Sequence, residues 1–312
     1  MIGNIVTAIA RFAVPFFFSV SGYFFYKGNQ YDERNTIPRK IKRLVRLLLF
    51  SEAVYFLFYA ALQVQNIGFT FRAFSNVIVS EVFQRYLGQW YCYIPVLAPP
   101  INGFCWFIGS LIAIYAVIYV TKGRKMSLTV SVLLLAFGIL LRCILCSAGV
   151  KTLFPYERLL PLLPFPFFMI GYYLRKYKDF CDGIDYRIYS AMLLIGAGLT
   201  VAESFAGAYT LYFGTPWLVV AAIALCGKYS RHEVGTWIGQ LFNHIGGKTA
   251  TYIYIFHLMV GNVLYVLVTR ILAVDDAHWI TQWGIPSMVC VSTAIVAEIV
   301  AVLKQALLLK RR

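Results

Sequence analysis

Charged residues are scarce in this 312-residue chain: they make up 13% of it, whereas soluble proteins carry about 25%. Hydrophobic residues reach 60%, aromatic residues 17%, and the mean hydropathy is +0.72. This composition excludes a soluble globular protein. The sequence also lacks a phosphate-binding glycine loop, a serine–histidine–aspartate order and an HExxH pattern, so it does not carry the marks of the enzyme classes that those motifs define.

A metal site is not indicated either. The seven cysteines show no close-set ligand pattern with histidine, and Cys143 and Cys146 fall within an apolar run, where a charged metal centre would be costly. Basic residues exceed acidic residues by 15, an excess that in a soluble chain would suggest nucleic acid as a partner. Here the charges lie between long apolar runs. We therefore expect a lipid bilayer as the partner, no nucleic acid and no metal.

Apolar runs long enough to cross a membrane recur along the whole chain. A helix needs about 20 mostly apolar residues to cross a hydrocarbon core of roughly 30 Å. The pattern therefore predicts an all-α fold, a polytopic integral membrane helical bundle that forms a single domain over residues 1–312. The nine predicted transmembrane helices run near Ile5–Tyr26, Leu44–Val64, Phe104–Val120, Ser127–Cys146, Leu159–Leu174, Ile188–Phe205, Leu211–Cys226, Thr249–Val268 and Trp283–Leu307.

Lysine and arginine indicate the orientation, because loops rich in these residues stay cytoplasmic. Of the 28 basic residues, five fall in one set of alternate loops, two fall within spans, and the remaining 21 fall in the other set. The sequence therefore predicts a multi-pass protein of the plasma membrane with a cytoplasmic C-terminus and an outer N-terminus. The five outer residues are Arg72, Arg85, Lys151, Arg158 and Arg270.

The outer loop between Gln65 and Gly103 is long and contains a helical pattern. Phe71, Phe74 and Ile78 recur at helical spacing, and Val82 continues the series. The pattern predicts a helix over residues 71–86. Such a helix either lies on the membrane surface or caps the bundle.

Several ionisable residues lie near the outer ends of the predicted spans, where the bilayer makes them expensive. Arg11 lies six residues from the outer end of the first span, and Arg142 and Glu203 lie near the outer ends of two later spans. Together with Arg158 they are candidates to line a polar vestibule open to the outside. The alternative is a salt bridge, of Arg11 or Arg142 with Glu203, that fastens the helices.

Arg43 and Arg46 are three residues apart at the cytoplasmic start of the second span, so they share one helical face. Two guanidinium groups in that position can hold an anion. The alternative is that both snorkel to the membrane interface, as arginines at span ends often do.

Three further ionisable residues lie deeper within predicted spans. Glu52 lies in the second span, His257 in the eighth and Glu298 near the middle of the ninth. A lone histidine in a span is often only hydrogen-bonded across helices. The sequence leaves the roles of all three open, and it does not distinguish an enzyme from a transporter.

Five motifs, in order along almost the whole chain, resemble those of the membrane acyltransferase-3 family. They are RFAVPFFFSVSGYF at residues 11–24, RLVR at 43–46, CWFI at 105–108, Arg158 followed by LPFPFFMIGYY at 163–173, and GGKTATYIYIFHL at 246–258. The likeness is nearest to members from Gram-positive bacteria, including the membrane half of vancomycin-resistance serine racemases. It implies a ten-span fold, of which the nine predicted spans would be the second to the tenth.

The resemblance also implies an activity. Members of the family move an acyl group, often acetyl, from acyl-CoA to a hydroxyl of a cell-envelope polysaccharide or of a small molecule, and this is an O-acetylation. On this likeness Arg43 and Arg46 are candidate contacts for the phosphates of acyl-CoA. The forked guanidinium group of arginine can bind two oxygens of one phosphate at once.

The other polar residues take roles on the same likeness. Arg11, Arg158 and Glu203 are candidates for the acceptor side or for polar packing. Glu203 and His257 are candidates for the catalytic base, and His257 matches a recurrent family position.

One part of the family pattern lies outside this sequence. The family's first helix carries the histidine regarded as the catalytic base, and the likeness places that histidine upstream of Met1. Without a base, acyl transfer to a hydroxyl would lose a factor of about 10²–10⁴ in rate. The readings are a start placed too late, a truncated and inactive acyltransferase, or a chain that works without acyl transfer.

A chain of the last kind would be a transporter of a small molecule, for example an amino acid such as serine. Arg11, Glu203 and Glu298 would then line the path of the substrate.

Overall fold

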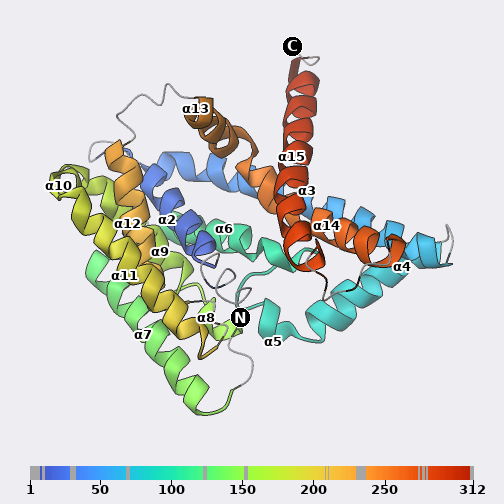
Figure 1. Ribbon diagram of the computed structural model, residues 1–312, viewed down its shortest axis with the longest axis horizontal. Helices are drawn as coiled ribbons and strands as arrows, with labels where there is room; N and C mark the ends of the chain where they lie inside the picture. The colour runs from blue at the N-terminus through green and yellow to red at the C-terminus, as the bar shows by residue number, and fades with distance from the viewer. Residues whose placement is uncertain are drawn as a thin grey trace. The chain divides into compact units, whose positions relative to one another are not determined.

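The computed structural model describes residues 8, 11–28, 33–67, 71–121, 125–150, 154–207, 209, 211–229, 237–272, 275, 278 and 280–309. Within these residues the chain forms helices joined by turns and contains no strand, so the all-α prediction is confirmed (Figure 1). The chain divides into two compact units, Met1–Arg231 and His232–Arg312.

The helices of the first unit are coloured blue to orange in Figure 1. They are α2 (Ala13–Phe25), η1 (Glu33–Thr36), α3 (Ile37–Ile67), α4 (Phe71–Val77), η2 (Ile78–Leu87), α5 (Trp90–Tyr93), η3 (Gly103–Cys105), α6 (Trp106–Val120), α7 (Leu128–Ser147), α8 (Phe154–Glu157), α9 (Pro164–Lys176), α10 (Lys178–Gly183), α11 (Tyr186–Ser204) and α12 (Gly214–Tyr229). The second unit contains α13 (Trp237–His244), η4 (Ile245–Thr249), α14 (Ala250–Val266), η5 (Leu267–Ile271), η6 (Ile280–Gly284) and α15 (Ile285–Leu309).

A helix lies over each predicted span, although most of the first span before Arg11 falls outside the described residues. Among the described residues, four helical stretches are long and apolar enough to be clear candidates for crossing a membrane: Ile37–Val64, Leu128–Ser147, Ala250–Thr269 and Ile285–Leu303. Three shorter apolar helices are Ala13–Phe25, Trp106–Val120 and Gly214–Lys228. A multi-pass membrane fold follows from these helices, and the number of nine crossings stays a prediction.

Helix α9 begins five residues later than the predicted span. The chain from Leu159 to Leu163 forms turns, and the helix begins at Pro164. Proline is favoured at the first position of a helix because its missing N–H has no partner there in any case. Pro164 and Pro166 therefore fix the start of this helix, which is buried along most of its length.

Helices α2 and α9 form the tightest joint of the first unit. A Cβ atom on Gly22 would lie 1.8 Å from the carbonyl oxygen of Phe168, and one on Gly171 would lie 1.8 Å from the carbonyl oxygen of Ser19. The Ser19 hydroxyl donates a hydrogen bond of 2.7 Å to the carbonyl of Phe167. Small residues let two backbones approach in this way, and such close packing is a main source of helix association in membranes.

An aromatic cluster continues this joint toward α6. The ring centres of Phe25 and Phe168 are 5.5 Å apart, and the Tyr115 ring lies 5.5 Å from Phe25 and 5.7 Å from Phe168. All three side chains are buried. Tilted and edge-to-face rings at these separations attract one another beyond the area they bury. The cluster joins α2, α6 and α9 in the core of the first unit.

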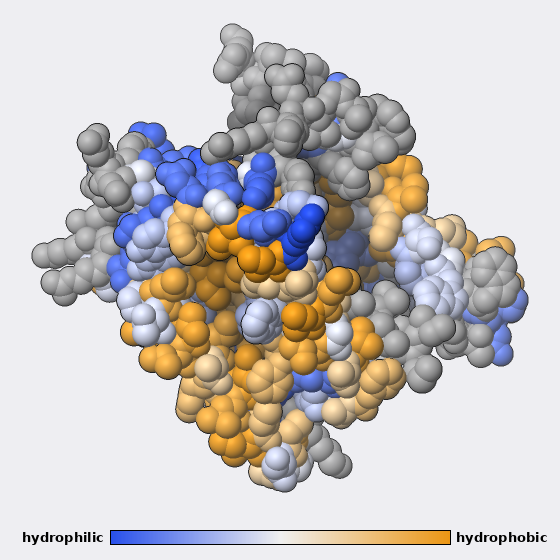
Figure 2. Space-filling view, turned by 60° about the vertical axis from the view of Figure 1, so that its left-hand side comes forward, coloured by the Kyte–Doolittle hydropathy of each residue, from blue (hydrophilic) through white to orange (hydrophobic). Residues whose placement is uncertain are grey.

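The outward side of the first unit is apolar. Figure 2 shows a broad hydrophobic surface with hydrophilic side chains gathered along one edge. On α7 and α11 the exposed residues include Leu133, Leu140, Leu194 and Ile195. A soluble protein rarely exposes so continuous an apolar patch, so this surface fits contact with lipid.

The close approach of α2 and α9 predicts that Gly22→Ala destabilises the protein. The added methyl group meets a backbone carbonyl, so the two helices must separate, which costs about 1–3 kcal/mol or more. The Gly198→Ala variant is the matched control, because a Cβ there meets nothing within 4 Å. Alanine favours a helix over glycine, so we expect the control to unfold at the same temperature or a higher one. Equal thermal unfolding midpoints for Gly22→Ala and the wild type in lipid nanodiscs would contradict the packing account.

Candidate functional site

Arg43 and Arg46 lie on α3 near its first turns, and both are exposed. In the part of the chain that the structure describes, neither guanidinium group makes a hydrogen bond or an ion pair. Each presents five N–H donors in a planar fork that matches a phosphate. The two side chains, which share a helical face, are therefore available to bind an anion.

Two lysine ammonium groups lie against aromatic rings of the first unit. The Nζ atom of Lys40, one turn before Arg43, lies 4.5 Å from the ring centre of Phe25 and 5.4 Å from that of Tyr115. Lys125 Nζ donates a hydrogen bond of 2.8 Å to the Tyr172 hydroxyl. An aromatic ring stabilises a cation without removing its charge. The aromatic residues thus hold positive charge at this end of the first unit.

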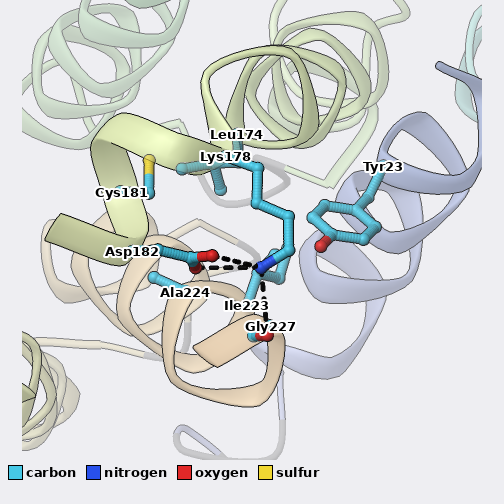
Figure 3. Close-up of a pocket in the computed structure, with 8 residues that line it drawn as sticks. All are labelled: Tyr23, Leu174, Lys178, Cys181, Asp182, Ile223, Ala224 and Gly227. Carbon is cyan, nitrogen blue, oxygen red and sulfur yellow. Dashed lines mark hydrogen bonds and ion pairs between the residues drawn. The ribbon is translucent and has the colours of Figure 1, made fainter. Parts of the chain in front are cut away.

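A shallow hollow lies among α2, α9, α10 and α12 (Figure 3). Lys178 reaches across it and donates to both carboxylate oxygens of Asp182, at 2.9 and 2.8 Å, and to the carbonyl of Gly227 at 3.2 Å. These acceptors match the three N–H donors of the ammonium group. The Lys178 side chain therefore connects α10 to α12 across this hollow. Burial raises the pKa of the Cys181 thiol on its wall, so this thiol stays protonated near neutral pH.

Arg142, which is buried, and Glu203, which is partly buried, form an ion pair between α7 and α11. Arg142 is 4% exposed, and its Nη2 atom lies 2.6 Å from Glu203 Oε1. Its Nη1 atom donates to the carbonyl of Leu211, and the other oxygen of Glu203 accepts from the backbone N–H of Phe213. This is the salt bridge that the sequence left open as the alternative to a polar vestibule, with Arg142 and not Arg11 as the direct partner of Glu203. It also ties both helices to the start of α12.

Arg11 joins the same cluster from the beginning of the described chain. Its guanidinium donates to the carbonyl of Tyr209, and the Arg142 guanidinium lies 4.4 Å from the ring centre of Tyr209. Arg158 takes a different partner and lies 4.8 Å from the ring centre of Trp106. The structure therefore brings Arg11, Arg142 and Glu203 together. A role of Glu203 as a base would require its pair with Arg142 to open.

Glu52 binds the turn before α6, a partner that the sequence did not reveal. Its two carboxylate oxygens accept hydrogen bonds from the backbone N–H groups of Ile101, at 2.9 Å, and Asn102, at 2.8 Å. Arg85 donates from the other side to the carbonyls of Pro100, at 3.1 Å, and Ile101, at 2.6 Å. The signal available in the sequence was the Glu81–Arg85 spacing of four, which is a helical ion pair at 2.6 Å.

The histidines of the second unit have separate partners. The His257 Nδ1 atom lies 2.7 Å from the carbonyl of Tyr254 in its own helix, so Nδ1 carries the proton and Nε2 is the basic nitrogen. His244 Nε2 lies 2.8 Å from Glu298 Oε2, which joins α13 to α15. Neither the position of the His257 bond within one helix nor the partner of Glu298 followed from the sequence.

The model of a protein family described as an acyltransferase domain, Acyl_transf_3, matches residues 1–300, nearly the whole chain. The chain belongs to acyltransferase family 3. No curated protein and no solved structure matches it. The family resemblance carried by the five motifs is thereby confirmed, and the chain is an acyltransferase-domain protein of the membrane.

Within this acyltransferase-3 chain the two arginine groups differ in one physical respect. Arg11 is bound to a backbone carbonyl and Arg142 to a backbone carbonyl and Glu203, whereas Arg43 and Arg46 carry no such bonds within the described residues. A group that is already bound serves the fold, and an unbound one is available to a ligand. Of these four arginines, Arg43 and Arg46 are therefore the two whose guanidinium groups are not occupied by other described residues.

The ion pair of Arg142 with Glu203 predicts that Glu203→Gln strongly destabilises this acyltransferase-3 chain. The change leaves the Arg142 charge buried beside a neutral amide, and breaking such a pair on one side costs about 3–5 kcal/mol. Thermal unfolding in nanodiscs measures the effect. Asp179→Asn removes one carboxylate from an exposed helix position and serves as the control, with an expected change within about 0.5 kcal/mol. An equal loss in both variants would mean that the pair is not what fastens the helices.

Proposed function

We propose that this chain transfers an acyl group, acetyl in particular, from acyl-CoA to a hydroxyl of a cell-envelope sugar or of a small molecule. The family supports an acyltransferase. The observation that carries the donor is the exposed pair Arg43 and Arg46, which makes no bond within the described residues.

Charge supports acyl-CoA as the donor. The coenzyme carries several phosphate charges and resides in the cytoplasm, and the cytoplasmic loops predicted from the sequence hold 21 of the 28 basic residues. Arg43 and Arg46 belong to that set, and Lys40 and Lys125 lie at the same end of the first unit. A positive surface raises the local concentration of an anionic ligand and speeds its encounter.

The reaction requires a proton acceptor. As the acceptor hydroxyl attacks the thioester carbonyl, its proton passes to a base, the bond between carbon and sulfur breaks, and coenzyme A leaves as the thiol after it takes up a proton. Of the two candidates in this chain, His257 has the fitting geometry, because its Nδ1–H is bound to Tyr254 and Nε2 keeps its lone pair. Glu203 is held by Arg142.

We expect the double variant Arg43→Ala, Arg46→Ala to bind acetyl-CoA at least about tenfold more weakly than the wild type, because each lost charged hydrogen bond is worth about 1.5–3 kcal/mol. Equilibrium binding of labelled acetyl-CoA to protein in nanodiscs measures this. The control is Arg39→Ala, Lys42→Ala, which removes the same charge one turn earlier on α3 from two exposed positions.

The possible outcomes distinguish a wrong donor site from a wrong function. An equal loss in both double variants means that general charge, and not a specific contact, attracts the donor. Absence of binding to the wild type, together with uptake of labelled serine into vesicles that contain no acyl-CoA, overturns the acyltransferase in favour of a transporter.

A further inference from the structure

The helix formed by α4 and η2 is amphipathic. Its polar face is turned toward the protein and its apolar face outward, which is the opposite of a helix on a protein surface in water. Its polar residues Glu81 and Arg85 point toward the protein, and their side chains are 19% and 31% exposed. Its outward residues are mostly apolar, together with Gln84 and Arg72. The exposed apolar residues are Phe71, Ile78, Val79, Phe83 and Leu87. A helix that faced water on that side would carry the opposite pattern.

The chain that follows this helix reaches the depth of the middle of α3. Glu52 lies eight residues into the predicted span Leu44–Val64, which is about 12 Å at 1.5 Å per residue. It therefore lies near the centre of that span. Because its carboxylate binds the backbone of Ile101 and Asn102, that turn lies at the same level.

The length of α6 agrees with this depth. Its 15 residues, Trp106–Val120, span only about 22 Å, which is short of a hydrocarbon core of roughly 30 Å. A helix that begins inside the membrane needs only the remaining distance to reach the other face. A start of α6 inside the membrane thus accounts both for the turn before this helix and for its short length.

The irregular backbone before α6 is partly enclosed by protein, and the side chains of Ile94 and Leu97, which remain exposed there, are apolar. A membrane requires that backbone which is not helical be covered by protein. Val96, Ala98 and Asn102 are buried. The carbonyl oxygen of Leu97 lies against Gly109 of α6, where a Cβ atom would be 2.1 Å away. Arg85 donates to the carbonyls of Pro100 and Ile101, and Glu52 accepts from the N–H groups of Ile101 and Asn102. The N–H of Cys105 donates to the carbonyl of Asn102, so the backbone polar groups of Pro100–Asn102 are satisfied within the protein.

We propose that residues 71–105 form a re-entrant segment whose apolar face is seated in the lipid of the outer half of the bilayer. The occupant of that face is lipid, because the face continues the lipid-facing side of a spanning helix. Phe74 of α4 packs on Phe56 of α3, with ring centres 6.3 Å apart, and Leu49 and Leu57 are exposed along α3. Trp90 and Tyr91, exposed beyond the helix, are residue types enriched at the membrane interface.

Labelling with a membrane-impermeant maleimide tests the re-entrant segment. Val79→Cys and Phe83→Cys are compared with Leu140→Cys, a lipid-facing position of α7, and Ala148→Cys, in the predicted outer loop after α7. The fraction labelled at each position is read by peptide mass spectrometry in nanodiscs that hold one chain each, and labelling in sodium dodecyl sulfate gives the maximum. We expect residues 79 and 83 to lose labelling as residue 140 does, while residue 148 is labelled.

Labelling of residues 79 and 83 at the rate of residue 148 would overturn the proposal and place the helix in water. Labelling in single-chain nanodiscs that disappears only at high protein density would overturn it in favour of a second copy of the chain on that face. Both readings are independent of acyl-CoA binding, so they leave the proposed function untouched.

The anchor of the segment has its own readout. Cys105 is 1% exposed, and its Sγ atom lies 3.2 Å from Ser51 Oγ and 3.1 Å from Asn102 Nδ2. We expect Glu52→Ala to release the turn and to make Cys105 react with a small, membrane-permeant maleimide, while Glu298→Ala, which removes a carboxylate from α15, leaves Cys105 unlabelled. Unchanged protection of Cys105 in Glu52→Ala would contradict the anchoring role of Glu52.

Discussion

A polar group in the hydrocarbon region of a bilayer has no water to bind, so it must find its partner within the protein. The first unit depends on this constraint at two places. Arg142 and Glu203 satisfy each other and tie α7 and α11 to the start of α12. Glu52 and Arg85 satisfy the backbone of the turn before α6. In both cases a charged side chain fixes irregular backbone, which places the ends of the neighbouring helices.

The same constraint distinguishes structural charges from those available to a ligand. Charges that are already bound inside the unit hold helices together, whereas Arg43 and Arg46 extend from α3 without a bond among the described residues. Lys40 and Lys125 lie against aromatic rings, which keep their charge available. In the proposed donor site, the charges of Arg43 and Arg46 therefore do not hold helices of the described part of the chain together.

The sequence predicted the helices well, because an apolar run of fixed length has few alternatives to a membrane helix. It also placed Arg142 and Glu203 near the outer ends of their spans, but it left a salt bridge between them as one of two alternatives. It did not predict the turn bound by Glu52 or the partners of Arg158 and Glu298, because these contacts join residues far apart in the chain. The observed start of a helix differs from the predicted start where a proline sets it, as at Pro164. The close approach at Gly22 and Gly171 likewise depends on which helices meet.

The central proposal is that this protein takes the acyl group from acyl-CoA on the cytoplasmic side of the membrane and transfers it to a hydroxyl acceptor. Inside-out membrane vesicles expose the cytoplasmic face to the medium, and right-side-out vesicles do not, so the two orientations provide the most direct comparison. With labelled acetyl-CoA outside and envelope material as acceptor, the account predicts that label leaves the coenzyme and becomes bound to hydroxyl groups only in inside-out vesicles that contain the protein. Transfer of equal extent in right-side-out vesicles, or no transfer in either, would contradict it.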